Sequence, residues 1–419
     1  MSQVEGFHGT HAGFGVETGG FGVRPYKIAV IAWESLHGVA VGSVSIHVSY
    51  LAENLVQRGH EVHLFVRRGP QQSEYENIHG VHYHRIFSTY DRDFVTEVSN
   101  LCHGFVAEVN NAESFMNAAF DVMHCHDWMT APALKILKTT MDRKCIFTMH
   151  STNGIRCGSK VFGPLTNKVI ELEQDGVGFC DRVVGVTGPL CDRIKVDYSF
   201  DWDKLRCIPY AFPFLEYEND HQSFDVRRKF HLDRNDFLIM YFGLFSPNRN
   251  LETLLDAMKL VAKDHHHAKL VLVGEGLTGV ELQNLAEEME IGHRITFLRG
   301  TQSSERKALY RSAEVVIQPV SSENVGTVCL EAWACRKPVI STTSSALRDL
   351  ITHQEDGLLV EADAEGLSWA MKYCLQNPEN SKRMGNNGFE KLSSPQFSSQ
   401  RIAELVNNVY DEVHGIYPA

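Results

Sequence analysis

Two glutamates eight positions apart, Glu323 and Glu331, have the spacing in this chain that most clearly suggests chemistry. A Gly-Thr pair lies between them and good helix formers follow, so we predict a helix that begins near Gly326. The first N–H groups of such a helix have no partner inside it, and with the helix dipole they can bind a diphosphate without a basic side chain. One turn into the helix, Glu331 could accept both hydroxyls of a ribose, while Glu323 in the preceding loop could meet the hydroxyls of a sugar. The predicted ligand is a nucleotide diphospho-sugar, and its other contacts would be Asn324, Val325, Gly326 and Thr327.

Glycine-containing loops follow two of the predicted strands. Residues 36–43 come after the strand at 27–33 and include Gly42 and Ser43, whose N–H groups could approach a phosphate or the reacting sugar. Gly274 opens a Gly-Glu-Gly segment after a later strand, where it would lie near the nucleotide. Each of these loops, like the segment with the two glutamates, could instead be an ordinary turn or a solvated loop.

Short apolar runs alternate with longer amphipathic segments, which is typical of an α/β fold with parallel sheets. The pattern restarts after a Pro-bearing stretch at 209–213, so we predict two domains with a cleft between them. In open α/β sheets ligands bind at the carboxyl ends of the strands, which would face this cleft. The predicted units are a flexible leader at 1–24, an N-terminal domain at 25–212, a C-terminal domain at 213–395 and a helical segment at 396–419.

The composition argues against several classes of protein. With 43% hydrophobic and 22% charged residues, the chain has the composition of a soluble globular protein. No apolar run reaches the roughly 18–20 residues that span a bilayer. A net charge of −12 argues against a nucleic acid partner, which needs clustered cations. The basic amphipathic stretch at 133–144 could touch an anionic lipid surface as a peripheral membrane contact, although a solvated helix face is the preferred interpretation.

The cysteines and histidines form no pattern typical of a metal site. The ten cysteines are scattered without a C-x-x-C pair, which indicates a reducing, cytoplasmic location and neither a disulfide frame nor a zinc site. Three adjacent histidines at 265–267 would point in different directions on a helix and cannot converge on one ion. The D-x-D pairs at 91–93 and 201–203 follow no apolar strand. We therefore expect no metal, and no cofactor apart from the donor substrate.

The order of segments around the two glutamates resembles the C-terminal domain of retaining GT-B glycosyltransferases of the family-four type, which include glycogen-synthase-like enzymes. A short apolar strand at 313–319 precedes the glutamates, and the runs 336–340 and 356–360 follow them. The resemblance extends from about Lys27 to the end of the chain. It implies a GT-B fold, in which two Rossmann-like, doubly wound domains face a central cleft. The N-terminal domain would then bind the acceptor and the C-terminal domain the nucleotide-sugar donor.

The resemblance also implies roles for residues elsewhere. His126, in the segment 124–128, would face the cleft and touch the donor sugar, although a packed histidine would fit the same position. Arg249 falls where the family has a Lys, and its planar guanidinium can grip phosphate oxygens. Leu244 falls where the family has an Arg, and it carries no charge. The candidate catalytic residues are therefore His126, Glu323 and Arg249, and the candidate acceptor contacts are His150 and Ser151.

The implied activity is transfer of a sugar, with a hexose expected, from a nucleotide diphospho-sugar to an acceptor hydroxyl. The anomeric configuration would be retained and no metal would be required. The acceptor could be a glycan, a lipid-linked sugar or a small molecule. Leu244 keeps open a second hypothesis, a catalytically weak or inactive relative that binds nucleotide or glycan. A metal-dependent GT-A transferase is a third hypothesis, which sensitivity to EDTA would reveal.

Overall fold

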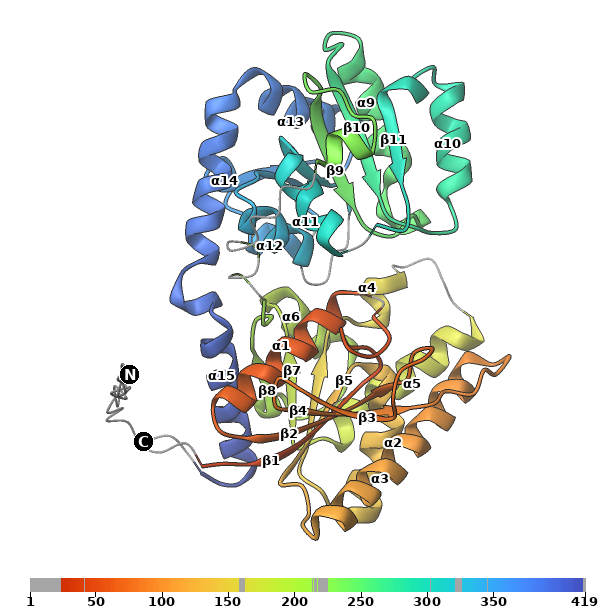
Figure 1. The fold of residues 1–419 in the computed structure, drawn as a ribbon, viewed down its shortest axis with the longest axis vertical. Coiled ribbons are helices and arrows are strands. Elements are labelled where there is room, and N and C mark those ends of the chain that lie inside the picture. Colours follow the sequence, from red (N-terminus) through yellow and green to blue (C-terminus); the bar gives the residue numbers. More distant parts are fainter. Residues whose placement is uncertain are drawn as a thin grey trace, which may run out of the picture.

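A computed structural model gives the fold of the chain (Figure 1). It describes residues 24–416 except 41, 158–162, 213, 215–216, 218–224, 302, 321–325 and 345. The described residues form two α/β domains, and the last helix returns from the second domain to the first (Figure 1). The catalytic candidate Glu323 and the predicted leader, apart from Arg24, lie outside the described residues.

The first domain is built on an eight-stranded sheet. Its strands are β1 Lys27–Ala32, β2 Glu61–Arg67, β3 Tyr75–Ile78, β4 Val81–Ile86, β5 Val122–His126, β6 Cys145–Met149, β7 Arg182–Gly185 and β8 Leu205–Cys207. They lie in the order β3-β4-β2-β1-β5-β6-β7-β8, and in this sheet only the β3–β4 pairing is antiparallel. Its helices are α1 Ser43–Gln57, α2 Phe94–Met116, α3 Ala131–Met141, α4 Asn153–Cys157, α5 Pro164–Phe179 and α6 Gly188–Asp197. The strand order reverses between β1 and β5, which makes that point the topological switch point of the sheet.

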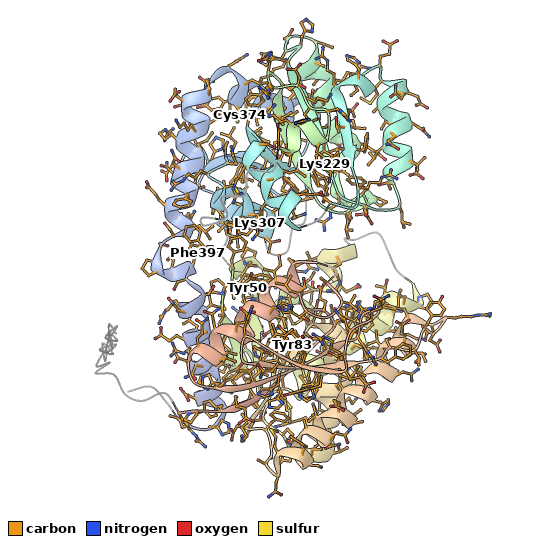
Figure 2. The ribbon with its side chains drawn as sticks, in the orientation of Figure 1. Tyr50, Tyr83, Lys229, Lys307, Cys374 and Phe397 are labelled. Atoms are coloured by element: carbon orange, nitrogen blue, oxygen red, sulfur yellow. The ribbon has the colours of Figure 1, made fainter. Side chains whose placement is uncertain are left out.

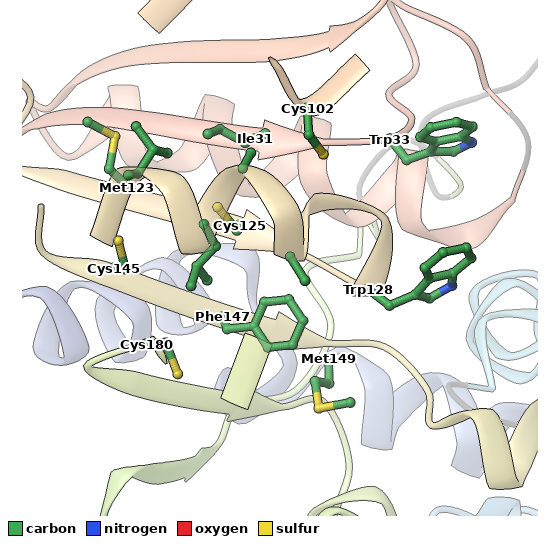
Figure 3. Packing of buried hydrophobic residues seen from close by; sticks show 14 of the residues in the cluster. Ile31, Trp33, Cys102, Met123, Cys125, Trp128, Cys145, Phe147, Met149 and Cys180 are labelled. Carbon is green, nitrogen blue, oxygen red and sulfur yellow. The ribbon is translucent and has the colours of Figure 1, made fainter. Parts of the chain in front are cut away.

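The core of the first domain explains why its central strands read as continuous apolar runs. Helices cover both faces of a parallel sheet, so both faces of each strand must be apolar. Figure 3 shows Ile31, Cys125 and Phe147, from the adjacent strands β1, β5 and β6, in one layer of side chains. Helix α5 packs so closely on this layer that a Cβ added to Gly176 would lie 2.3 Å from the Phe147 ring.

The basic amphipathic stretch predicted at 133–144 falls on α3. Its apolar residues Leu134 and Leu137 are buried in the core of the first domain. Two of its lysines form ion pairs with the domain itself, because Lys135 and Lys138 lie 2.9 and 2.8 Å from aspartates. The apolar side of this helix is therefore packed against protein, as in the preferred interpretation of the stretch.

The second domain contains a six-stranded parallel sheet in the order β11-β10-β9-β12-β13-β14. Its strands are β9 Phe237–Phe242, β10 Ala268–Val273, β11 Ile295–Leu298, β12 Val315–Gln318, β13 Val339–Thr342 and β14 Gly357–Val360. Relative to the first strand of the domain this is the 3-2-1-4-5-6 order of a doubly wound nucleotide-binding sheet, with its switch point between β9 and β12. Its helices are α8 Val226–Lys229, α9 Leu251–Ala262, α10 Gly279–Glu288, α11 Ser303–Ser312, α12 Thr327–Ala334, α13 Ala364–Gln376 and α14 Pro378–Leu392.

The predicted C-terminal helical segment ties the second domain back to the first. Helix α15, Ser399–Val413, lies beside α1 in Figure 1 and buries Ile402, Val406 and Tyr410 in the core of the first domain. The Tyr26 hydroxyl donates a hydrogen bond to Asp411 on this helix at 2.6 Å. The chain therefore crosses between the domains twice, once after β8 and once before α15.

The fold agrees with the predicted two α/β domains built on parallel sheets, in the predicted chain order. In the part of the chain that the structure describes, no helix combines the length and the apolar character needed to cross a membrane. The nine cysteines whose side chains are described are all free thiols.

Candidate active site

The loops at the two switch points lie on facing edges of the domains. The segment after β9 contains Asn248, whose side-chain amide donates to the Arg156 carbonyl of α4 at 3.0 Å. This hydrogen bond joins the carboxyl edge of the second sheet to the carboxyl edge of the first. Because ligands of doubly wound sheets bind at these edges, the site is built here from both domains.

A buried relay of side chains lies at the carboxyl end of β5. His126 Nδ1 lies 3.1 Å from His150 Nε2, and His150 Nδ1 lies 2.8 Å from the Tyr210 hydroxyl. Burial raises the pKa of Tyr210, and Ser43, which lies near this hydroxyl at the start of α1, lowers it. His126 Nε2 is buried and has no hydrogen-bond partner among the described residues. Such an atom costs about 1–3 kcal/mol when left unpaired, so the relay ends in a position suited to a polar ligand.

The histidines of this relay are neutral. Burial lowers the pKa of both His126 and His150 well below the usual value, and neighbouring histidines lower it further. Two tautomer patterns satisfy the chain of hydrogen bonds: one leaves a proton on His126 Nε2, and the other leaves a lone pair there. In either pattern His126 offers a sugar hydroxyl a hydrogen bond without a charge.

The structure brings together the predicted residues His126, His150 and Ser43, and adds Tyr210. Both ring nitrogens of His150 are engaged in the relay, so an acceptor could bind this ring only by displacing a partner. Ser151 is also buried and donates its hydroxyl proton to the Thr152 carbonyl at 3.1 Å. The acceptor roles of His150 and Ser151 stay predictions, and the geometry makes His150 a residue that positions His126.

Asp127 is a functional candidate that sequence reasoning missed. It follows β5 with φ of 66°, a left-handed conformation that a non-glycine residue adopts at a cost. Its carboxyl group is buried, and its Oδ1 makes no hydrogen bond among the described residues. This oxygen lies 3.8 Å from the Arg156 guanidinium. Burial raises the pKa of Asp127 to about 6, and Arg156 opposes that rise. Arg156 is itself committed to an ion pair with the buried Glu173. Asp127 therefore carries a buried carboxyl group of raised pKa, and it directly follows His126 in the chain.

The loop between β1 and α1 carries the predicted donor contacts Gly42 and Ser43. Gly42 precedes α1, and its N–H donates to the Glu34 carboxylate at 2.6 Å. Glu34 therefore occupies the amide that was predicted to bind the donor, so binding there would require an exchange of partners. The roles of Gly42 and Ser43 in donor binding stay predictions.

The Gly-Glu-Gly segment after β10 has a clear packing requirement. A Cβ on Gly274 would lie 1.8 Å from the Gly243 carbonyl oxygen, and one on Gly276 would lie 2.1 Å from that of Phe245. Glycine at these positions lets the loops after β9 and β10 pass each other in direct contact. This packing accounts for both glycines, and contact between Gly274 and a nucleotide stays a prediction.

Arg249 lies at the end of a short 3-10 helix, Pro247–Arg249, directly before α9. The next residue, Asn250, has φ of 56° and donates to the carbonyls of Pro319 and Ala362 at 3.1 and 3.2 Å. These bonds hold the segment beside the end of β12. Because Asn248 contacts the first domain, Arg249 belongs to the segment that borders the other domain. Leu244, at the start of this segment, has 57% of its side chain exposed.

Helix α12 begins where the two-glutamate segment predicts a helix. Gly326 precedes it with φ of 68°, and a Cβ at this residue would lie 2.3 Å from a Leu347 methyl group. No side chain among the described residues caps the helix. Its first N–H groups could therefore bind a diphosphate, and this role stays a prediction. Thr327 opens the helix and is buried. Glu323, Asn324 and Val325 lie outside the described residues, so their roles stay predictions.

Glu331 occupies a different environment from the one expected for a ribose ligand. Its carboxylate is buried and accepts hydrogen bonds from Arg306 Nε and Nη2 at 3.0 and 2.7 Å. The hydroxyls of Tyr310 and Tyr217 donate two more, at 2.7 and 2.8 Å. Burial alone would raise the pKa of Glu331, but Arg306 and the tyrosines hold it below the usual value. These four bonds use the acceptor capacity of the carboxylate, so ribose could bind only by displacing a donor such as Tyr217. The ribose role therefore stays a prediction that needs a rearrangement.

An apolar cavity of about 210 Å³ lies between the domains near the linker that follows β8. Gly326 and Leu330 of the α12 segment form part of its wall, opposite Tyr210 of the relay. Phe397 closes it on the side where the chain crosses back, and Figure 2 shows this residue at the junction between the domains. The other lining residues are Val186, Thr187, Gly188, Pro189, Cys207, Pro209, Leu347, Asp349 and Leu350.

The D-x-D pairs have local structural roles. Asp93 precedes α2 and accepts a hydrogen bond from Thr96 at 2.8 Å, and Asp201 accepts one from the Asp203 N–H at 3.1 Å. Among the described residues, the one group of side chains with metal-ligand spacing is His37, Glu53 and His79. It includes none of the D-x-D aspartates, whose interpretation as non-ligands stays a prediction.

Two family models match the chain, one on each domain. Residues 44–212 match Glycosyltransferase Family 4, and residues 222–391 match Glycosyl transferases group 1. An uncharacterized glycosyltransferase of Methanocaldococcus jannaschii is 29% identical over 393 residues, which cover 92% of this chain and 97% of that protein. A D-inositol 3-phosphate glycosyltransferase of Segniliparus rotundus is 23% identical, over 83% of this chain and 80% of that protein.

Solved structures with the same fold cover nearly the whole chain. Sucrose-phosphate synthase from Thermosynechococcus elongatus has a TM-score of 0.76 at 23% identity, over 92% of this chain and 99% of that one. HepE from Anabaena, solved in complex with UDP and glucose, has a TM-score of 0.73 at 16% identity, over 92% of this chain and all of that one. These similarities confirm the predicted GT-B arrangement of the two domains.

Proposed function

Because the chain belongs to the group 1 glycosyltransferases, we propose that it moves a sugar from a nucleotide diphospho-sugar to an acceptor hydroxyl with retained configuration and without a metal ion. The observation that carries the proposal is the free end of the histidine relay. His126 Nε2 is buried, neutral and unpartnered among the described residues, beside Asp127 and at the switch point of the first sheet. A sugar hydroxyl at this position would supply the missing partner.

The proposed reaction breaks the bond between the anomeric carbon and the donor phosphate oxygen. The acceptor oxygen forms its bond to the same face of that carbon, and its proton passes to the departing phosphate oxygen. Arg249 and the first N–H groups of α12 stabilise the negative charge that develops on the diphosphate. Glu323, in the segment before α12, binds the hydroxyls of the donor sugar. No step requires an additional acid or metal ion, because the leaving group itself accepts the proton.

The relay has a defined task in this scheme. The Tyr210 hydroxyl fixes the orientation of the His150 ring, and His150 in turn fixes that of His126. A neutral, oriented imidazole binds a hydroxyl of the donor sugar without adding positive charge near the anomeric carbon, where positive charge develops. Asp127 is the second residue proposed to bind a sugar hydroxyl. Its left-handed backbone turns the chain away from β5 directly after His126.

The relatives suggest which donors and acceptors to examine first. HepE was solved with UDP and glucose, and starch synthase IV from Arabidopsis thaliana with ADP and acarbose. We therefore propose a UDP- or ADP-linked hexose as donor. Some relatives are named for D-inositol 3-phosphate and for sucrose phosphate. We therefore propose phosphorylated small molecules as acceptors, in addition to glycans and lipid-linked sugars.

The test is nucleotide release from UDP-, ADP- and GDP-hexoses with a panel of these acceptors. We expect release from one donor, dependent on an acceptor, unchanged by EDTA and lost in Glu323→Ala. Glu355→Ala serves as the matched control, because Glu355 is an exposed glutamate of the same domain. Donor binding without release across the panel would contradict the proposal and favour the inactive relative that Leu244 suggests.

Arg249→Ala should slow transfer more than it weakens nucleotide binding. A charged hydrogen bond is worth about 1.5–3 kcal/mol, so its loss in the transition state lowers kcat roughly 10- to 150-fold. Steady-state kinetics with the preferred donor, together with calorimetry of nucleoside diphosphate binding, measures both effects. Arg249→Lys should recover part of the rate. Equal losses of kcat and of nucleotide affinity would assign Arg249 to binding alone.

A further inference from the structure

A cluster of three potential metal ligands lies in the first domain, outside the histidine relay. It consists of His37, Glu53 and His79, and their ligand atoms all lie within 4.8 Å of one another. Glu53 Oε1 is already 2.9 Å from His79 Nδ1. The His37 and His79 rings face each other edge to face with centroids 6.1 Å apart.

The fold brings these groups together from three separate elements. His37 lies in the loop after β1, and its carbonyl accepts a hydrogen bond from Arg85 Nε of β4 at 2.7 Å. Its ring packs edge to face on Tyr83, a buried residue of β4 that Figure 2 labels in the first domain. Glu53 comes from α1, which crosses the same edge of the sheet.

His79 comes from the tight turn between β3 and β4. The turn has two residues, His79 and Gly80, with φ of 52° and 85°. Two-residue hairpin turns of this type favour Asn-Gly or Gly-Gly, because both residues must take positive φ. The histidine here directs an imidazole toward Glu53, where asparagine would be the conformationally simpler choice.

We propose that His37, Glu53 and His79 bind a Zn²⁺ ion, with water in the fourth position. Two imidazoles and one carboxylate form a ligand set typical of zinc. With ligands about 2.0–2.1 Å from the ion, tetrahedral geometry places the ligand atoms about 3.4 Å apart. The ligand atoms lie within 4.8 Å of one another, so binding would require side-chain rotations that bring them to this spacing. The His79 side chain is 68% exposed, so it is free to turn and the ion can reach the site from solvent.

The charges around the cluster are compatible with a cation. Arg85, the basic residue that contacts the His37 segment, pairs with Glu76 at 2.9 Å, which offsets its charge. Glu53 supplies one negative charge to the site.

A bound ion would link the loop after β1, helix α1 and the β3–β4 turn. The loop leads directly into Gly42 and Ser43, so the ion would stabilise the start of α1. It would take no part in bond breaking, because the leaving diphosphate is assigned to the second domain. An experiment can therefore contradict the zinc site without contradicting the proposed sugar transfer, and the reverse.

The test measures zinc binding to the full chain after treatment with a chelator and its removal by dialysis. We expect the wild-type protein to bind one equivalent of Zn²⁺ more than the His79→Asn variant. Asparagine suits the left-handed conformation of this turn, so the substitution should preserve folding. In Glu53→Gln the affinity for this equivalent should fall at least about tenfold, since changes even to residues behind a metal ligand cost that much. Co²⁺ in the same site should give the visible absorption of tetrahedral coordination in the wild-type protein but not in His79→Asn.

His266→Asn is the matched control, because His266 is exposed in the three-histidine tract and could bind zinc weakly. It should leave the extra equivalent unchanged. Equal zinc stoichiometry in the wild-type protein and His79→Asn, with both folded by circular dichroism, would overturn the proposal. Nucleotide release assayed in His79→Asn with and without EDTA separates a stabilising zinc ion from any metal requirement of the transfer itself.

Discussion

Glu331→Ala is expected to lower the free energy of unfolding by about 3 kcal/mol. The change leaves the Arg306 guanidinium without its partner and removes the acceptor of the Tyr217 and Tyr310 hydroxyls. Loss of one member of a buried ion pair costs about 3–5 kcal/mol, and the lower end applies because one third of the Arg306 side chain is exposed. Urea denaturation of the wild-type and variant proteins measures the difference.

The double variant Arg306→Met with Glu331→Leu serves as the control. Replacing both charges by apolar groups should recover most of the loss, because no unpaired charge remains. A Glu331→Ala protein of unchanged stability that binds nucleotide weakly would contradict the structural role and support the predicted ribose contact. Reduced stability with unchanged nucleotide affinity would assign Glu331 to the fold alone.

Acidification from pH 6.5 to 5 is expected to destabilise the protein steeply. Burial lowers the pKa of His47 and of His124 to about 3, whereas each has a pKa near 6.5 in the unfolded chain. Below pH 6.5 these two histidines therefore bind protons in the unfolded state but stay neutral in the folded state. Each histidine withdraws stability along a slope that approaches about 1.4 kcal/mol per pH unit below pH 6.5, and the stability is fully present well above pH 6.5.

His126 and His150 act in the same direction, because burial lowers the pKa of each. Asp127 acts in the opposite direction, since its raised pKa of about 6 makes the folded state bind a proton first. The net expectation is a loss of several kcal/mol by pH 5, measured as a falling urea midpoint with a constant m-value. In His124→Gln the dependence of the unfolding free energy on pH should lose the contribution of one histidine, which is at most about 1.4 kcal/mol per pH unit. An unchanged slope would show that His124 titrates normally in the folded protein.

The fold could be predicted because it follows from local patterns. Apolar runs of strand length alternate with amphipathic segments, and this alternation alone indicates two parallel sheets. Helix α12 was predicted from Gly326 and the helix formers after it, and it begins at Thr327 as expected. The position of His126 also follows from the chain, because it ends an apolar strand and strand ends face the cleft in this class of fold.

The partners of the site residues could not be predicted, because they come from distant parts of the chain. Glu331 looked like a free ligand of ribose because nothing near it in sequence reveals Arg306 or Tyr217. Tyr210 stood in the linker without an assigned role, and the fold places its hydroxyl on His150, the residue that follows β6.

Two further features depend on backbone geometry and topology. The left-handed conformation of Asp127, the residue that follows His126, has no signal in the residue types around it. The proposed zinc ligands His37, Glu53 and His79 are separated by 16 and 26 positions, and the fold brings them together because β4 pairs with β2 next to β1. The expectation of no metal rested on local spacing and stays a prediction that the zinc-binding experiment tests.

The most direct test of the proposed reaction is proton NMR of the first product formed from an α-linked nucleotide hexose. The coupling constant of the anomeric proton reports the configuration before any slow equilibration occurs. We predict an α-linked product that appears together with free nucleoside diphosphate in EDTA. A β-linked first product, or transfer that requires an added divalent cation, would contradict it.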